Sequence, residues 1–129
     1  MSEINGFEDL ISWQKARQLV RQVHELTNGV SFKKDHDLRR QICRASVSTM
    51  SNIAEGYERE GDREFIQFLS QAKASCGEVR SQLYVAHDLG NVNDKEFQSL
   101  HDIASETSRV ISGLISYLRK SDYMGSKFK

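Results

Sequence analysis

The chain has 129 residues and no proline, a length that suits one domain with its own core. Many residues are good helix formers, which together with the absence of proline favours an all-α fold. The 18 basic and 18 acidic residues cancel, so the net charge gives no support for binding to nucleic acid or to a membrane. No run approaches the roughly 18 apolar residues that a membrane span needs, and we expect a cytoplasmic protein.

The two cysteines, Cys43 and Cys76, stand in neither a metal-binding nor a redox spacing. Both fall near apolar stripes, so we expect two small buried thiols. A disulfide between them is the less favoured alternative.

The first predicted helix begins near residues 7–9 and ends at Asn28-Gly29, a typical helix stop. Its apolar residues recur at three- and four-residue steps: Leu10, Trp13, Ala16, Val20, Val23 and Leu26. A connector over residues 30–34 follows. Asp35 and Asp37 then suit the positive end of the next helix.

The second predicted helix is apolar on two faces and ends around Glu60-Gly61. One stripe consists of Leu38, Ile42, Ala45, Thr49, Ile53 and Tyr57. A second apolar set consists of Val47, Met50 and Ala54. A helix with two apolar faces is covered from two directions, so we expect this helix at the bundle centre or at a subunit interface.

The third and fourth predicted helices complete the domain. The third opens with Asp62 as its cap and ends at residues 88–90, with a near-heptad stripe of Phe65, Phe68, Leu69, Ala72, Cys76, Val79, Leu83 and Ala86. The fourth opens at Asn93 or Asp94 and runs to Leu118. Short connectors favour antiparallel neighbours, so residues 1–120 are predicted to form an up-down-up-down four-helix bundle. Residues 121–129 lack periodicity and are predicted to be a flexible tail.

The motifs of common enzyme and metal sites are missing from the sequence. No histidine follows a glutamate by three residues, as di-iron bundles require. No Gly-x-Ser-x-Gly turn or phosphate-binding glycine loop occurs. His36 beside Asp37 could ligate a metal, but we favour a solvated pair at a helix start. We therefore predict no catalytic, cofactor or metal site.

The run from Ser51 to Arg59 places Asn52, Glu55, Gly56 and Tyr57 inside a helix, and Glu78 lies inside the next one. Polar residues and glycine suit a helix interior poorly unless a neighbouring helix needs them. Glu55 and Glu78 could form a carboxylate pair for acid–base chemistry. We favour a structural role, in which both carboxylates fix helix register by accepting hydrogen bonds. The expected donors are Arg44, Arg80, Ser75 and Asn52.

Basic residues are concentrated in the first part of the chain. Residues 12–48 contain eight basic and three acidic residues, a net charge of +5. The eight are Lys15, Arg17, Arg21, Lys33, Lys34, Arg39, Arg40 and Arg44. They could form a patch that contacts phosphates of RNA or DNA. We favour an ordinary solvated face, since no aromatic residues alternate with the basic ones to stack bases.

Several blocks of sequence resemble the four-helix bundle protein family encoded in intervening sequences of bacterial 23S rRNA genes. The resemblance spans residues 7–118 and rests on Phe7-Glu8-Asp9-Leu10, Trp13 to Ala16, Leu38 to Ile42, Arg44-Ala45, Ser51 to Arg59, Glu64 to Leu69, Glu78 to Leu83 and Asp88-Leu89-Gly90. It implies an up-down bundle that assembles into a homopentameric ring, with no enzyme activity and an unknown function. A related branch, the accessory variability protein of diversity-generating retroelements, implies binding to nucleic acid and to a reverse transcriptase.

Taken together, the sequence predicts a non-enzymatic, self-assembling interaction or scaffold protein without a cofactor. A nucleic-acid-binding accessory protein is the alternative. A carboxylate-based enzyme is the least favoured reading.

Overall fold

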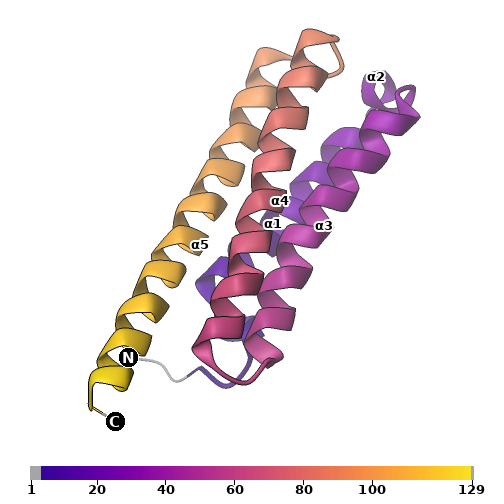
Figure 1. Ribbon diagram of the computed structural model, residues 1–129. Helices are drawn as coiled ribbons and strands as arrows, with labels where there is room; N and C mark the ends of the chain where they lie inside the picture. Colours follow the sequence, from indigo (N-terminus) through magenta and orange to yellow (C-terminus); the bar gives the residue numbers. More distant parts are fainter. Residues whose placement is uncertain (1–3, 129) are drawn as a thin grey trace.

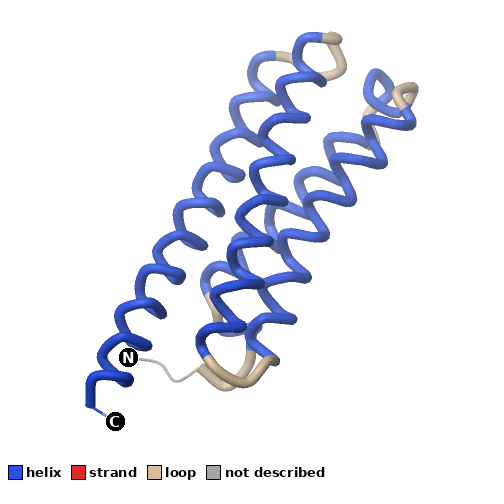
Figure 2. The backbone as a smooth tube through the Cα atoms, in the orientation of Figure 1, coloured by secondary structure: helices blue, strands red, loops and turns tan. Residues whose placement is uncertain are grey.

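The structure, a computed structural model, describes the backbone of residues 4–128 and the side chains of residues 4–121. This part of the chain is helical throughout and contains no strand (Figure 2). The elements are the 3₁₀-helix η1 (Phe7–Asp9) and the α-helices α1 (Ile11–Thr27), α2 (Val30–Lys33), α3 (His36–Glu58), α4 (Asp62–Asp88) and α5 (Asp94–Phe128). The predicted all-α class is confirmed.

Four long helices, α1, α3, α4 and α5, lie side by side (Figure 1). In Figure 1 the chain reverses direction between each long helix and the next. α3 packs against α1 and α4, and α5 packs against α4 and α1. The buried apolar side chains form two clusters, one around Phe32 and Leu83 near α2 and one around Phe65 and Leu118 near η1. The core therefore runs the length of the bundle.

Glycines and side-chain caps define the turns between these helices. Gly61 has φ of 96° and Gly90 has φ of 77°, a left-handed conformation that favours glycine after a helix end. The Asp35 carboxylate accepts a hydrogen bond from the Leu38 amide at 3.2 Å and so caps α3.

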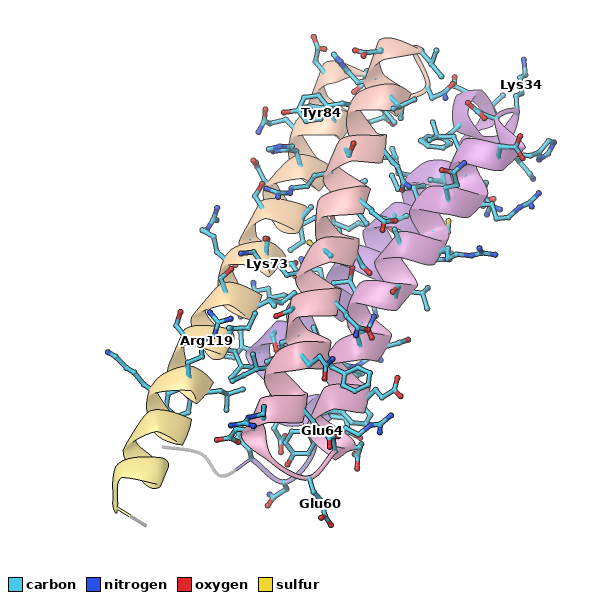
Figure 3. All side chains as sticks on the ribbon, in the orientation of Figure 1. Lys34, Glu60, Glu64, Lys73, Tyr84 and Arg119 are labelled. Atoms are coloured by element: carbon cyan, nitrogen blue, oxygen red, sulfur yellow. The ribbon has the colours of Figure 1, made fainter. Side chains whose placement is uncertain are left out.

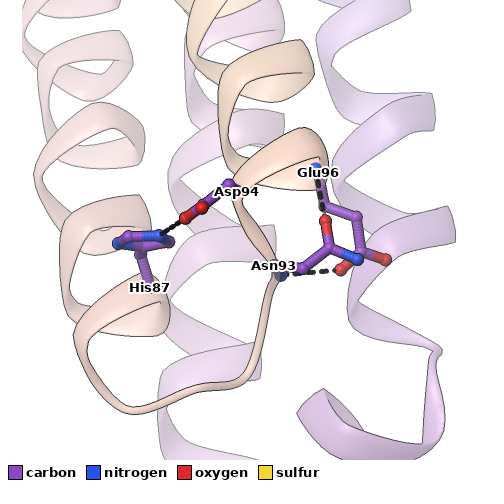
Figure 4. A network of polar contacts seen from close by, with 4 residues as sticks. All are labelled: His87, Asn93, Asp94 and Glu96. Carbon is purple, nitrogen blue, oxygen red and sulfur yellow. Dashed lines mark hydrogen bonds and ion pairs between the residues drawn. The ribbon is translucent and has the colours of Figure 1, made fainter.

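A reciprocal cap fixes the start of α5 (Figure 4). The Glu96 amide donates to Asn93 Oδ1 at 2.8 Å, and the Asn93 amide donates to Glu96 Oε1 at 2.9 Å. This pair is a capping box. His87 Nε2 lies 2.6 Å from Asp94 Oδ1, which ties the end of α4 to the start of α5. The predicted opening of the fourth helix at Asn93 or Asp94 is confirmed.

Three local features differ from the sequence prediction. Phe7–Asp9 forms a separate 3₁₀-helix because Leu10 is extended, with φ of −73° and ψ of 128°. The expected connector after α1 contains a short helix, α2, whose Phe32 side chain is buried in the core. The N-cap of α4 is Gly61, and Asp62 is the first helical residue.

The last helix is longer than predicted. The backbone of α5 continues to Phe128, past the expected end at Leu118, since no proline interrupts it. Side chains beyond residue 121 lie outside the described residues. The flexible tail over 121–129 therefore stays a prediction.

The second apolar set of α3 is only partly covered by the chain itself. The Val47 side chain is 43% exposed, and Met50 and Ala54 are half-buried. Ile42 and Ile53 of the first stripe are fully buried. Met50 packs against the core cluster around Phe65, so within the second set Val47 alone is exposed.

Candidate functional site

Gly56 allows α3 and α4 to approach closely. A Cβ atom at Gly56 would lie 2.7 Å from Phe68 Cβ and 3.0 Å from Phe65 Cδ1. Tyr57 continues this contact edge-on to the Phe65 ring, with centroids 6.0 Å apart. The glycine of the 51–59 run therefore has a packing reason to be a glycine.

Polar groups join α3 and α4 along a line that we call the α3–α4 seam, formed by Ser48, Asn52 and Ser75. Ser48 Oγ and Ser75 Oγ are hydrogen-bonded at 2.9 Å. Asn52 Nδ2 donates to Ser48 O at 2.9 Å and to Ser48 Oγ at 3.1 Å. The asparagine thus orients the serine that reaches the neighbouring helix, as expected for a residue that sets register.

A polar groove of about 350 Å³ lies beside the α3–α4 seam. It is lined by Gln41, Arg44, Ala45, Ser48, Ser75, Glu78 and Gln82. The Gln82 Oε1 atom is buried and has no hydrogen-bond partner among the described residues. The groove therefore combines two opposite charges with one unsatisfied acceptor.

Glu55 and Glu78 do not share a site. Ser48 meets Ser75 across two helices that run in opposite directions (Figure 1). Glu55 lies on one side of that contact and Glu78 on the other, about 15 Å apart along the helix axes at about 1.5 Å per residue. Glu55 Oε1 pairs with Arg59 Nη2 at 3.0 Å rather than with any of the four predicted donors. The geometry gives no carboxylate pair for acid–base chemistry.

The eight predicted basic contacts do not form one surface. Lys15 Nζ is held by Glu106 Oε1 of α5 at 2.8 Å. The Arg17 guanidinium lies over the Trp13 ring, 5.6 Å from its centroid, and Arg44 lines the groove beside the α3–α4 seam. Arg21 is exposed on α1. The remaining four, Lys33, Lys34, Arg39 and Arg40, lie on or beside α2 and the first turn of α3.

The two ends of the bundle carry different clusters of charge. Figure 3 shows Lys34 beside α2 at one end of the bundle and Glu60 and Glu64 at the opposite end. Each end also carries the opposite charge, with Asp35 and Asp37 beside α2 and Arg59 and Arg63 at the turn between α3 and α4.

An open groove of about 320 Å³, which we call the basic groove, lies between α1 and α3 near α2. Its lining residues are His24, His36, Arg39, Arg40 and Cys43. The sequence prediction included His36 only as a possible metal ligand beside Asp37 and did not include His24 as a site residue. The sequence does contain a signal for this pair, because the two histidines flank a short connector between antiparallel helices. Such a connector brings the last turn of one helix beside the first turn of the next.

Both cysteines are free, so the disulfide alternative is wrong. Cys76 is buried, and its Sγ donates to the Ala104 carbonyl at 3.2 Å. Burial raises the pKa of Cys76 to about 11, although the nearby Arg80 charge lowers it in part. Cys43 is only half-buried and lines the basic groove. The prediction of a buried thiol therefore holds for Cys76 alone.

Metal-binding clusters and membrane-spanning helices are both absent from the described residues. No cluster of three or more histidine, cysteine, aspartate or glutamate side chains within that part of the chain is arranged to hold a metal ion. None of the helices, as far as they are described, combines the length and apolar character needed to cross a membrane.

Comparison with known proteins places the fold and the family. Residues 8–113 match the family model described as 23S rRNA-intervening sequence protein. A solved structure of similar fold is a protein of unknown function from the S23 ribosomal protein family of Bacteroides thetaiotaomicron VPI-5482, with a TM-score of 0.74 and 21% identity. The similarity covers 81% of this chain and 98% of that chain. No curated protein matches the chain. Because the family model covers most of the sequence, the chain belongs to the 23S rRNA-intervening sequence protein family.

Proposed function

We propose that this protein is a non-enzymatic interaction module that assembles with copies of itself, using an antiparallel up-down-up-down bundle as its building block. The observation that carries the proposal is the second apolar set of α3, in which Val47 is 43% exposed. The sequence left two explanations for a helix with two apolar faces, the bundle centre and a subunit interface. Met50 packs against the core, whereas the exposure of Val47 supports a subunit interface at this position.

The chemistry of this face suits a second protein surface. Val47, Met50 and Ala54 follow a three- and four-residue spacing, the pattern of a helix seam. Covering such a stripe removes apolar surface from water, at about 25 cal/mol for each Å² buried. A face that meets a different face of the next copy closes into a ring when the rotation permits. The homopentameric ring that the family resemblance implies is part of this proposal.

Two matched substitutions test the assembly and its location. Val47 and Val85 are 43% and 44% exposed but lie on different helices, α3 and α4. Val47→Glu should dissociate the assembly in sedimentation velocity at micromolar concentration, because a buried unpaired carboxylate is costly. Val85→Glu should leave the assembly intact.

Three results would contradict the proposal. A wild-type monomer at micromolar concentration would remove self-assembly. Dissociation by Val85→Glu alone would move the interface to α4. Native mass spectrometry that shows a copy number other than five would remove the pentamer while leaving the interaction module.

Nucleic-acid binding is a second candidate, and a cluster of basic side chains at and after α2 is the observation in its favour. Lys33, Lys34, Arg39 and Arg40 gather there, and a ring would repeat them in every copy. The logarithm of the binding constant for a structured RNA should then fall linearly with the logarithm of salt concentration, and Lys33→Gln with Lys34→Gln should reduce the slope. Affinity without salt dependence would contradict this candidate.

A further inference from the structure

We propose that the basic groove is a binding site for a phosphate-class oxoanion, either inorganic phosphate or the terminal phosphate of a phosphomonoester. The groups that would hold the anion are His24, His36, Arg39 and Arg40. The site is complete within one copy of the chain, so it does not depend on self-assembly.

Arg39 is oriented by the end of α1. Its Nε donates to the Thr27 carbonyl at 3.1 Å, and the side chain is half-buried. This bond fixes the plane of the guanidinium, whose two terminal nitrogens have no partner among the described residues. A guanidinium with two parallel donors free matches the oxygens of a phosphate.

His24 is oriented in a similar way, one turn earlier on α1. Its Nδ1 lies 2.9 Å from the Val20 carbonyl, and a carbonyl can only accept, so Nδ1 carries the hydrogen. The free nitrogen is then Nε2, which becomes a second donor when the ring is protonated. Two backbone carbonyls of α1, those of Val20 and Thr27, thus hold two nitrogen side chains in place.

Two carboxylates, those of Asp35 and Asp37, belong to the start of the helix that borders the basic groove, but neither lines the groove itself. None of its five lining residues carries a carboxylate. Asp37 lies 3.9 Å from Arg40 Nη2, with its side chain 87% exposed, so this pair contributes little. The Asp35 carboxylate is occupied by the Leu38 amide and the Asn91 side chain. His36 is the first residue of α3, whose positive dipole end adds to the attraction for an anion.

The size and lining of the groove favour a phosphate over other anions. Four nitrogen-bearing side chains from two helices line the groove, and several donors suit a phosphate, which has more acceptor oxygens than a carboxylate. No aromatic ring other than the two imidazoles lines the groove, so it offers no broad platform for stacking a base. At about 320 Å³ the open groove has room for a group attached to the phosphate.

The test uses inorganic phosphate as the titrant in isothermal calorimetry with the full-length protein, at constant ionic strength in chloride. Arg40→Gln and His36→Gln change exposed residues, so both variants should keep the helical circular dichroism of the wild type. Each should weaken phosphate binding by five-fold or more. The matched control is Arg21→Gln, since Arg21 is an exposed arginine beside Gln14, Arg17 and Gln18, outside the groove, and its loss should change the affinity by less than two-fold.

Two further arms identify the source of the phosphate and the independence of the site. A short single-stranded oligonucleotide with a 5′-phosphate should compete with inorganic phosphate, and the same oligonucleotide without it should not. Val47→Glu should bind phosphate as the wild type does. The proposal is overturned if phosphate binds no more tightly than chloride, if Arg21→Gln lowers the phosphate affinity as much as Arg40→Gln does, or if Val47→Glu abolishes phosphate binding. If phosphate binds but the 5′-phosphate makes no difference, the result supports inorganic phosphate as the ligand.

Discussion

The two sides of α3 differ in how they meet their neighbours. Toward α4 the helix approaches so closely that Gly56 has no room for a side chain, and Ser48 bonds directly to Ser75. Toward α1 the helix also packs, but near α2 this contact gives way to the basic groove. We call the α4-facing contact at Gly56 and Ser48, beside which the polar groove lies, the closed side, and the α1-facing contact near α2 the open side.

The difference separates the residues that specify the fold from those available for partners. Asn52, Gly56 and Tyr57, which make the sequence recognisable, all serve the closed side. The open side is lined by His24 of α1 and by Arg39, Arg40 and Cys43 of α3. The family signature therefore lies at the α3–α4 contact, whereas the side chains suited to binding lie at the groove between α1 and α3.

The largest effect should come from filling the closed side. Gly56→Ala places a Cβ 2.7 Å from Phe68 Cβ, an atom that cannot move without moving α4. We expect the free energy of unfolding to fall by about 3 kcal/mol, the upper end for overpacking. Gly77→Ala is the control, because its Cβ would meet nothing within 4 Å. That variant should gain about 0.5 to 1 kcal/mol from helix propensity.

Chemical denaturation monitored by circular dichroism measures both glycine variants. Equal stability changes for Gly56→Ala and Gly77→Ala would mean that the closed side tolerates a wider helix separation. The contrast between the two sides of α3 would then lose its physical basis.

The next effect concerns the two thiols, one in the core and one on the open side. The pKa of Cys76 is raised from 9.0 to about 11 by burial, so the folded state keeps the proton more tightly than the unfolded state. The resulting stability is fully present below pH 9 and is lost as pH rises from 9 to about 11. The loss should amount to about 2 to 3 kcal/mol, since one pKa unit corresponds to about 1.4 kcal/mol.

Unfolding curves at pH 8 and pH 10.5 for the wild type and Cys76→Ala isolate this contribution from other titrating groups. A loss of stability at pH 10.5 that is the same in both proteins would contradict it.

In the native protein at pH 8, a thiol reagent should modify Cys43 quickly and Cys76 only after unfolding. Cys43→Ser should abolish the fast phase. Fast modification of both thiols in the native protein would show that the core around Cys76 opens to the reagent as readily as the basic groove does.

The sequence predicts the positions of the helices better than it predicts which face of each helix is buried. Ala16 and Val23 lie in the predicted stripe of the first helix and are fully buried. The buried face is centred one position away from the most apolar stripe, so that Leu19 and Thr27 are buried while Val20 is only half-buried. A polar residue such as Thr27 can be buried because its Oγ1 donates to a carbonyl of its own helix, a compensation that hydropathy alone does not reveal.

The site features were predicted less completely, because they depend on which helices become neighbours. The close approach at Gly56 is suggested by a glycine inside a helix. The separation of Glu55 from Glu78 follows only from the register at Ser48 and Ser75. The pairing of Lys15 with Glu106 and the meeting of His24 with Arg39 likewise require the tertiary structure.

The smallest predicted effect compares one polar contact on each side of α3. Ser48 Oγ and Ser75 Oγ are 2.9 Å apart on the closed side, whereas Cys43 Sγ and Thr27 Oγ1 are 3.4 Å apart on the open side. Double-mutant cycles to alanine should give a coupling energy of about 1 kcal/mol for the serine pair. The cysteine–threonine pair should give less than about 0.5 kcal/mol, because a thiol is a weak hydrogen-bonding group. Equal coupling energies for the two pairs would show that α1 is held to α3 as specifically as α4 is. The basic groove would then result from the shape of the side chains around it and not from weaker contacts between α1 and α3.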